Sequence, residues 1–248
     1  MKISKIGIYA LSVVMLVSSC GTVQNLNNTT KGGVIGGTSG AAIGALLGNL
    51  TAPKHGNKTS RTLFGTAIGA AVGTGAGLLI GKKMDKAKAA AQQVQNAKVE
   101  QVTDANGYEA VKMTFDSGIL FATGKSNLTP AAKTSLSQFV NNVLIPYPDV
   151  DVAIYGHTDN QGFRGVTDPA VNAQKNRDLS LQRATEVTRY LLENGMAQTQ
   201  IKYVEGLGQD QPVADNSTEY GKQQNRRVEV FLYPSESMIK AAEAGTLQ

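Results

Sequence analysis

The chain contains little of what most catalytic and metal sites require. Among its 248 residues there are one cysteine, two histidines and no tryptophan. One cysteine excludes a disulfide within the chain, and two histidines are too few for a zinc site, which normally takes three or four ligands. The sequence also has no CxxC, HExxH or phosphate-binding loop. We therefore expect a binding protein rather than an enzyme, with no cofactor and no metal.

A strong charge of one sign is missing as well. The formal net charge is +5, but Lys2 and Lys5 lie in an acid-free leader; without residues 1–19 the balance is 22 basic against 19 acidic residues. No basic run is interleaved with aromatic residues, which nucleic-acid-binding proteins commonly show. Nucleic acid is therefore not an expected partner.

The N-terminus, "MKISKIGIYALSVVMLVSSC", has the pattern of a secretory signal, with two lysines, an apolar core and small residues. "LVSSC" resembles the bacterial lipobox, which implies cleavage after residues 1–19 and acylation of Cys20 with palmitate-type chains. The alternative is an ordinary signal peptide with an incidental cysteine. The resemblance implies two acyl chains on the lipid attached to Cys20 and a third on its amino group, and three chains make membrane anchoring effectively permanent. No acidic residue follows Cys20 directly, and by resemblance to lipoprotein sorting patterns this implies the outer membrane.

Residues 32–81 contain an internal repeat that follows a lipidated tether, 20–31. Each copy carries five glycines spaced by four: Gly32, Gly36, Gly40, Gly44 and Gly48, then Gly65, Gly69, Gly73, Gly77 and Gly81. This spacing places the glycines on one helix face, where another helix can pack closely. Each copy spans roughly 26 Å as a helix, near the hydrocarbon thickness of a bilayer. We expect a glycine-zipper helical hairpin in or against the outer membrane. A disordered linker and a zipper that only self-associates into a homo-oligomer remain alternatives.

The remainder reads as a helical linker, an α+β domain and a C-terminal tail. Residues 82–107 are rich in alanine and lysine and predict a helical spacer, and 234–248 form the tail. Between them, 108–233 show the order β-α-β-α-β-β, which predicts helices on one face of a mixed sheet. The expected strands are 109–115, 148–156, 201–208 and 226–234, with a short one at Ile119–Phe121; the expected helices begin at Pro130, capped by Thr129, and at Leu179.

Two charged residues stand out in this domain. Arg183 falls in the first turn of the helix predicted from Leu179, where a cation is disfavoured, and Asp159 leaves the end of the preceding strand. Together they suit a zwitterion, with Asp159 binding an ammonium and Arg183 a carboxylate. The alternative is that the two simply pair with each other. His157 beside Asp159 suggests a hydrolase or metal site, but the only other histidine, His55, lies in the zipper loop, and we interpret His157 as structural.

Several motifs in order resemble the OmpA-like C-terminal domain, a noncovalent peptidoglycan binder: "ILFATGKSNLTPAA", "GHTDN", "NRDLSLQRATEVTRYL" and "QQNRRVEVFL". With the lipobox and zippers, the whole chain resembles YiaD-type outer-membrane lipoproteins. The resemblance implies that Asp159 and Arg183 hold the diaminopimelate of the stem peptide. It also implies a set of surrounding binding residues: Asn160, Asn176, Leu179, Phe121, Thr123 and Arg227. Asn225 and Arg226 complete the "NRR" motif that supports the pocket.

The chain departs from the family pattern at one place. Sixteen residues separate Asp159 from Asn176, an insertion that covers the pocket or tunes its specificity. The expected function is to tether the outer membrane to the cell wall through peptidoglycan, with the C-terminal domain in the periplasm. The alternative is a zipper oligomer, scaffold or pore that the wall-binding domain only localises.

Overall fold

The computed structural model describes residues 74–103 and 109–247. Most of the predicted zipper hairpin, the predicted lipidation site Cys20 and the predicted signal segment lie outside these residues, so those predictions stay untested. Among the helices of the described part, none is long and apolar enough to cross a membrane.

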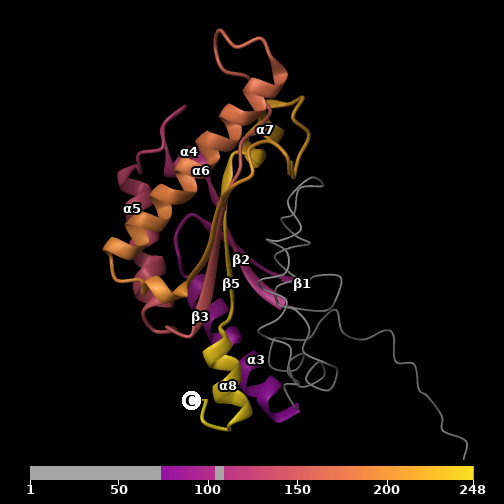
Figure 1. The fold of residues 1–248 in the computed structure, drawn as a ribbon. Helices are drawn as coiled ribbons and strands as arrows, with labels where there is room; N and C mark the ends of the chain where they lie inside the picture. The colour runs from indigo at the N-terminus through magenta and orange to yellow at the C-terminus, as the bar shows by residue number, and fades with distance from the viewer. Residues whose placement is uncertain (1–73, 104–108, 248) are drawn as a thin grey trace, which may run out of the picture.

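The domain is an α+β sandwich, as predicted, with a mixed sheet at its centre (Figure 1). The strands lie in the order β1-β2-β5-β3-β4, and only β3 and β4 run parallel. The strands are β1 Ala97–Thr103, β2 Glu109–Asp116, β3 Val150–Gly156, β4 Ile201–Gly206 and β5 Arg227–Pro234. The helices are α3 Thr74–Ala91, α4 Ser117–Leu120, α5 Pro130–Phe139, η1 Val140–Leu144, α6 Pro169–Glu193, η2 Gln198–Gln200, α7 Glu219–Asn225 and α8 Glu236–Glu243.

The main core lies between the sheet and the two helices α5 and α6, which cover the same face of the sheet (Figure 1). Thr129 caps α5 as predicted, since its side chain accepts a hydrogen bond from the Ala132 N–H at 3.0 Å. A second buried cluster on the other face contains the edge-to-face pair Tyr155 and Phe231. Alternate side chains of the strands therefore contribute to two apolar layers, one on each face of the sheet.

Within the segment predicted as a helical spacer, 82–107, the described residues 82–103 are part of the domain instead. Helix α3 ends at Ala91, and the chain turns through Asn96, at φ 59°, into edge strand β1, which pairs with β2. Met84, Ala87, Ala91 and Val94 are buried in the core because they recur on one face of this segment. Residues 82–103 are therefore built into the domain, as α3 and an edge strand, and do not form a free helical spacer.

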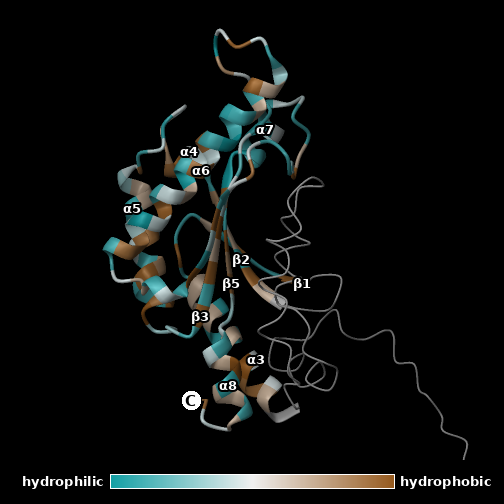
Figure 2. Cartoon of the chain, viewed as in Figure 1, coloured by the Kyte–Doolittle hydropathy of each residue, from teal (hydrophilic) through white to brown (hydrophobic). Residues whose placement is uncertain are grey.

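The C-terminal tail is also structured. Ser235 caps α8, whose Met238, Ile239 and Ala242 are buried, and α8 packs against α3. Figure 2 shows hydrophobic residues where α3 and α8 lie together and mostly hydrophilic residues on the N-terminal turns of α6. The two helices close the end of the domain where the chain enters from residue 74.

Two local predictions are wrong. Ile119–Phe121 is not a strand: Asp116 accepts the Gly118 N–H at 2.6 Å and begins the short helix α4, leaving Phe121 with one isolated bridge to Leu128. Helix α6 begins at Pro169 rather than Leu179, because Asp168 caps it through the N–H groups of Ala170 and Val171. Its first turns project beyond the sheet, where no apolar stripe is needed.

Candidate functional site

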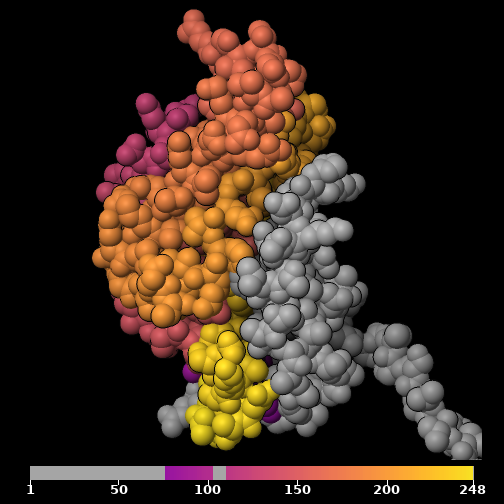
Figure 3. Space-filling model, in the orientation of Figure 1, coloured from indigo at the N-terminus to yellow at the C-terminus, as the bar shows by residue number. Residues whose placement is uncertain are grey.

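The predicted site residues gather at the end of the domain opposite α3 and α8. Loops after α4, β3 and β4 and the turn before β5 meet there, and the segment 160–168 with the first turns of α6 projects above them (Figures 1 and 3). Leu207 and Thr158 join these loops, because the Leu207 N–H donates to the Gly156 carbonyl at 2.9 Å and the Thr158 N–H to the Gly208 carbonyl at 2.8 Å.

Asp159 is buried, with 5% of its surface exposed, and both of its carboxylate oxygens are engaged. Its Oδ1 accepts the Gln161 N–H at 3.0 Å, and its Oδ2 lies 2.5 Å from Arg226 Nη1. Among the described residues, its ion-pair partner is thus Arg226 and not Arg183. The alternative in which Asp159 and Arg183 pair directly is not what the structure shows.

Arg183 lies in the middle of α6, so its predicted place in a first turn is wrong and the argument from the helix dipole does not apply. What distinguishes it is burial of a cation, with 5% of its surface exposed. Its Nε donates to the Lys125 carbonyl at 3.0 Å, and its guanidinium carbon lies 5.1 Å from the centroid of the Phe121 ring. Burial lowers the pKa of Arg183, while Asp159 acts to raise it and Arg226 to lower it. Arg183 is therefore close enough to Asp159 to interact electrostatically.

The other predicted residues divide between the wall and the rim of the site. Asn176 is buried and its amide nitrogen donates to the Gln161 carbonyl at 3.2 Å and to Gln209 Oε1 at 3.1 Å, which fixes the loop after Asp159. Leu179 is half-buried, whereas Asn160 and Thr123 are exposed on the surrounding loops. Phe121 is buried beneath Arg183.

Arg227 supports the site from below rather than facing Asp159. It is buried, with its Nε 2.8 Å from Glu229 Oε1, and it donates to the carbonyls of Asn225 and Gln211 at 3.3 Å each. Sequence reasoning gave its neighbour Arg226 only a supporting part, yet Arg226 is the residue that contacts Asp159. Chain spacing gives no signal for this contact, since the two are 67 residues apart.

The insertion between Asp159 and Asn176 forms an ordered loop followed by extra turns of α6. Asn172 holds the loop closed, because its Oδ1 accepts the Phe163 N–H at 2.7 Å and its Nδ2 donates to the Val166 carbonyl at 2.9 Å. Lys175 lies 5.7 Å from the centroid of the Phe163 ring. The insertion therefore stands beside the site as a fixed wall.

His157 is buried with 1% of its surface exposed, and its Nε2 lies 3.4 Å from Glu229 Oε2. Burial lowers the pKa of His157, and the nearby Arg227 and Lys112 act in the same direction against Glu229. Burial alone would raise the pKa of Glu229, but His157 and Arg227 lower it to about 2. In the part of the chain that the structure describes, no group of three His, Cys, Asp or Glu side chains could hold a metal ion.

This buried pair predicts a stability that declines in acid. A folded-state pKa of His157 below its usual 6.5 means that the unfolded chain binds more protons, so the free energy of unfolding decreases as pH falls below 6.5. Asp151, whose pKa burial raises to about 6, acts in the opposite sense because the folded state binds its proton more readily. We therefore expect the free energy of unfolding, measured with urea, to fall between about pH 7.5 and 5.5 by more in the wild type than in His157→Gln. Equal losses in the two proteins would contradict the assignment.

The comparisons with known proteins agree with the resemblance drawn from the motifs. Residues 120–226 match the model of the OmpA family, and residues 1–85 match the YMGG-like Gly-zipper model. The chain is 35% identical over 125 residues to the outer-membrane lipoprotein YfiB of Pseudomonas aeruginosa, covering 50% of this chain and 67% of that protein. It is 33% identical over 147 residues to the probable lipoprotein YiaD of Escherichia coli, covering 57% and 62%.

A third relative is the peptidoglycan-binding protein ArfA of Mycobacterium tuberculosis, 39% identical over 114 residues, which are 46% of this chain and 32% of that protein. The chain thus spans about a third to two thirds of the lengths of these relatives. All three matches are limited to part of each protein.

Proposed function

The chain belongs to the OmpA family, and on that premise we propose that it binds peptidoglycan noncovalently and tethers the outer membrane to the cell wall. The ligand is the diaminopimelate of the stem peptide, a residue that carries an ammonium and a carboxylate on its side-chain carbon. The protein acts by binding and not by catalysis.

The observation that carries this proposal is the buried, charge-matched pair of Asp159 and Arg183 at one end of the domain. Both are 5% exposed, yet Arg183 has no carboxylate partner within salt-bridge distance among the described residues. A buried guanidinium with a planar fork is well suited to a carboxylate ligand. The name of the ArfA relative as a peptidoglycan-binding protein supports the same ligand class.

In the free protein, Arg226 occupies the place that the ligand's ammonium would take. Its guanidinium pairs with Asp159, and its side chain is 32% exposed. We infer that the ammonium displaces Arg226, which can turn into solvent, while Arg183 stays fixed by the Lys125 carbonyl and the Phe121 ring. Exchange of one cation for another keeps the buried Asp159 neutralised throughout.

The arrangement of the domain suits a tether. The site lies at the end opposite α3 and α8, and the chain enters through α3, whose first turns are the end of the predicted zipper segment that follows the proposed lipidation site Cys20 (Figure 1). Wall and membrane contacts would then lie at opposite ends of the periplasmic domain. A single weak pocket suffices, because many anchored copies face a repeating polymer.

The proposal is tested with the full chain, purified in detergent and mixed with isolated sacculi. We expect it to be retained on diaminopimelate-type walls, to be released by free meso-diaminopimelate, and to bind poorly to lysine-type walls. Lysine lacks the side-chain carboxylate, so Arg183 would have no ligand group to bind. Equal retention on both wall types would overturn the proposal.

A further inference from the structure

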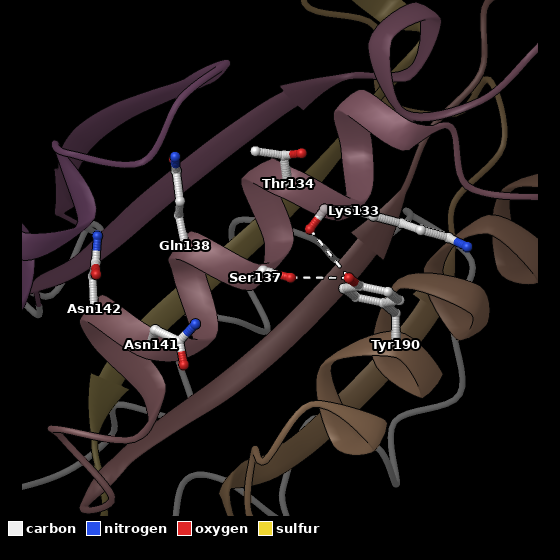
Figure 4. Close-up of a pocket in the computed structure, with 7 residues that line it drawn as sticks. All are labelled: Lys133, Thr134, Ser137, Gln138, Asn141, Asn142 and Tyr190. Carbon is white, nitrogen blue, oxygen red and sulfur yellow. Dashed lines mark hydrogen bonds between the residues drawn. The ribbon is translucent and has the colours of Figure 1, made fainter.

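A hollow of about 430 Å³ lies on the outer surface of the helices, between α5 with η1 and the C-terminal half of α6. Figure 4 shows its lining residues, with the Tyr190 hydroxyl of α6 meeting Ser137 and the Lys133 carbonyl of α5, and with Gln138 and Asn142 extending from the opposite side of the same helix. The lining residues are Lys133, Thr134, Ser137, Gln138, Asn141, Asn142 and Tyr190. We call this the α5–α6 hollow; no residue predicted for the peptide site takes part in it.

The chemistry of the α5–α6 hollow is that of amides and hydroxyls. It contains no acidic residue and a single charged one, Lys133. The Tyr190 hydroxyl lies 2.9 Å from Ser137 Oγ and donates to the Lys133 carbonyl at 3.2 Å, so the ring is held in one position (Figure 4). Amide and hydroxyl groups both donate and accept hydrogen bonds, as sugar hydroxyls and acetamido groups do. Purely apolar ligands fit such a lining poorly.

The backbone of η1 turns the two asparagines outward. This segment is a π-helix, in which the Ile145 N–H donates to the Val140 carbonyl at 2.9 Å. Val140, Val143 and Leu144 are fully buried, which leaves Asn141 and Asn142 exposed. Single π-turns within helices occur frequently at functional sites. The irregular turn thus presents two neighbouring amides to solvent in the lining of the α5–α6 hollow.

The α5–α6 hollow also lies at a suitable distance from Arg183. Arg183 and Tyr190 are two turns apart on the same face of α6, about 10.5 Å along the helix axis. Along the facing segments the contacts follow in the same order, with Lys125 against Arg183 and then Lys133 and Ser137 against Tyr190. In peptidoglycan, diaminopimelate is separated from the sugar by two residues and a lactyl group. At about 3.5 Å per link, this is roughly the same length.

We propose that the α5–α6 hollow binds an N-acetylated sugar of the glycan strand whose stem peptide reaches Asp159 and Arg183. The inference rests on the proposed function, since it takes the peptide end of the same ligand to lie at that site. Asn141, Asn142 and the Ser137–Tyr190 hydroxyl pair supply the hydrogen bonds. The domain would then bind both components of peptidoglycan. Its charged site would bind the stem peptide, and the polar α5–α6 hollow would bind the glycan.

The test compares two defined ligands on the full chain in detergent: the free stem tetrapeptide, and the same tetrapeptide on its disaccharide. Two added hydrogen bonds predict that the disaccharide form binds about tenfold more tightly. The double variant Asn141→Ala/Asn142→Ala should lose this advantage while its affinity for the free tetrapeptide stays unchanged. Tyr190→Phe, which keeps the ring, should lose part of it. The matched control is Gln198→Ala, which removes an exposed amide elsewhere.

The outcomes separate the two proposals. No binding of either ligand by the wild type refutes the proposed function itself. Equal affinity for both ligands, or a double variant that weakens both ligands alike, overturns the sugar site and leaves the peptide site standing.

Discussion

Arg183→Ala is expected to abolish retention of the protein on diaminopimelate-type walls, with a loss of affinity of about thirtyfold or more. Removing one partner of a buried, hydrogen-bonded charge pair costs 2–5 kcal/mol or more, and each 1.4 kcal/mol is a tenfold change. The loss should not come mainly from unfolding, because Asp159 keeps its ion pair with Arg226 when Arg183 is removed, so no buried carboxylate is left unpaired in the free protein. Retention on sacculi measures binding, and thermal unfolding measures the fold.

Two further variants sharpen this prediction. Arg183→Lys keeps the charge but cannot reproduce the bond from Nε to the Lys125 carbonyl or the stacking on Phe121, so it should restore little binding. Arg189→Ala is the matched control: it lies on the same helix, but its side chain is 53% exposed and pairs with Glu186 and Glu193. Wild-type retention by Arg183→Ala would show that the buried cation does not bind the wall.

The sequence predicted the elements whose residues carry a local signal. Thr129 and Pro130 begin α5 where expected, and the alternation in 148–156 gives β3. A capping residue followed by proline, here Asp168 and Pro169, also begins α6, whereas the apolar pattern predicts a start ten residues later, at Leu179. Its first turns project beyond the sheet and are largely exposed, so they lack the apolar periodicity that identifies a packed helix.

In the candidate site too, local sequence patterns identify individual residues but not the contacts between distant ones. Asp159 and Arg183 were identified from residue type and from motifs, and the fold brings both to one end of the domain. The helix dipole does not single out Arg183, because this residue lies in the middle of α6 and not in its first turn. The contact between Asp159 and Arg226 depends on how β5 pairs with β3, a tertiary property that no local pattern encodes. Which ligand the site binds stays a prediction.

Gly156→Ala is expected to lower stability strongly and to weaken wall binding at the same time. Gly156 ends β3, three residues before Asp159, and a Cβ there would lie 2.0 Å from the Ser180 carbonyl oxygen of α6. Overpacking of this kind costs about 3 kcal/mol, which lowers the melting temperature by roughly 6–12 °C in a domain of this size. Because Ser180 lies three residues before Arg183, moving α6 outward also separates Arg183 from Asp159.

Two controls distinguish this collision from the general cost of replacing glycine. Gly245→Ala, at φ 68° with open space around it and distant from the site, should cost only about 1–2 kcal/mol and leave binding unchanged. Ser180→Gly should not rescue Gly156→Ala, because the colliding atom belongs to the backbone and not to the serine side chain. Calorimetry of the single and double variants measures both effects. Rescue by Ser180→Gly, or a wild-type melting temperature for Gly156→Ala, would show that β3 and α6 are not packed this closely, and Asp159 and Arg183 would then be held together by some other contact.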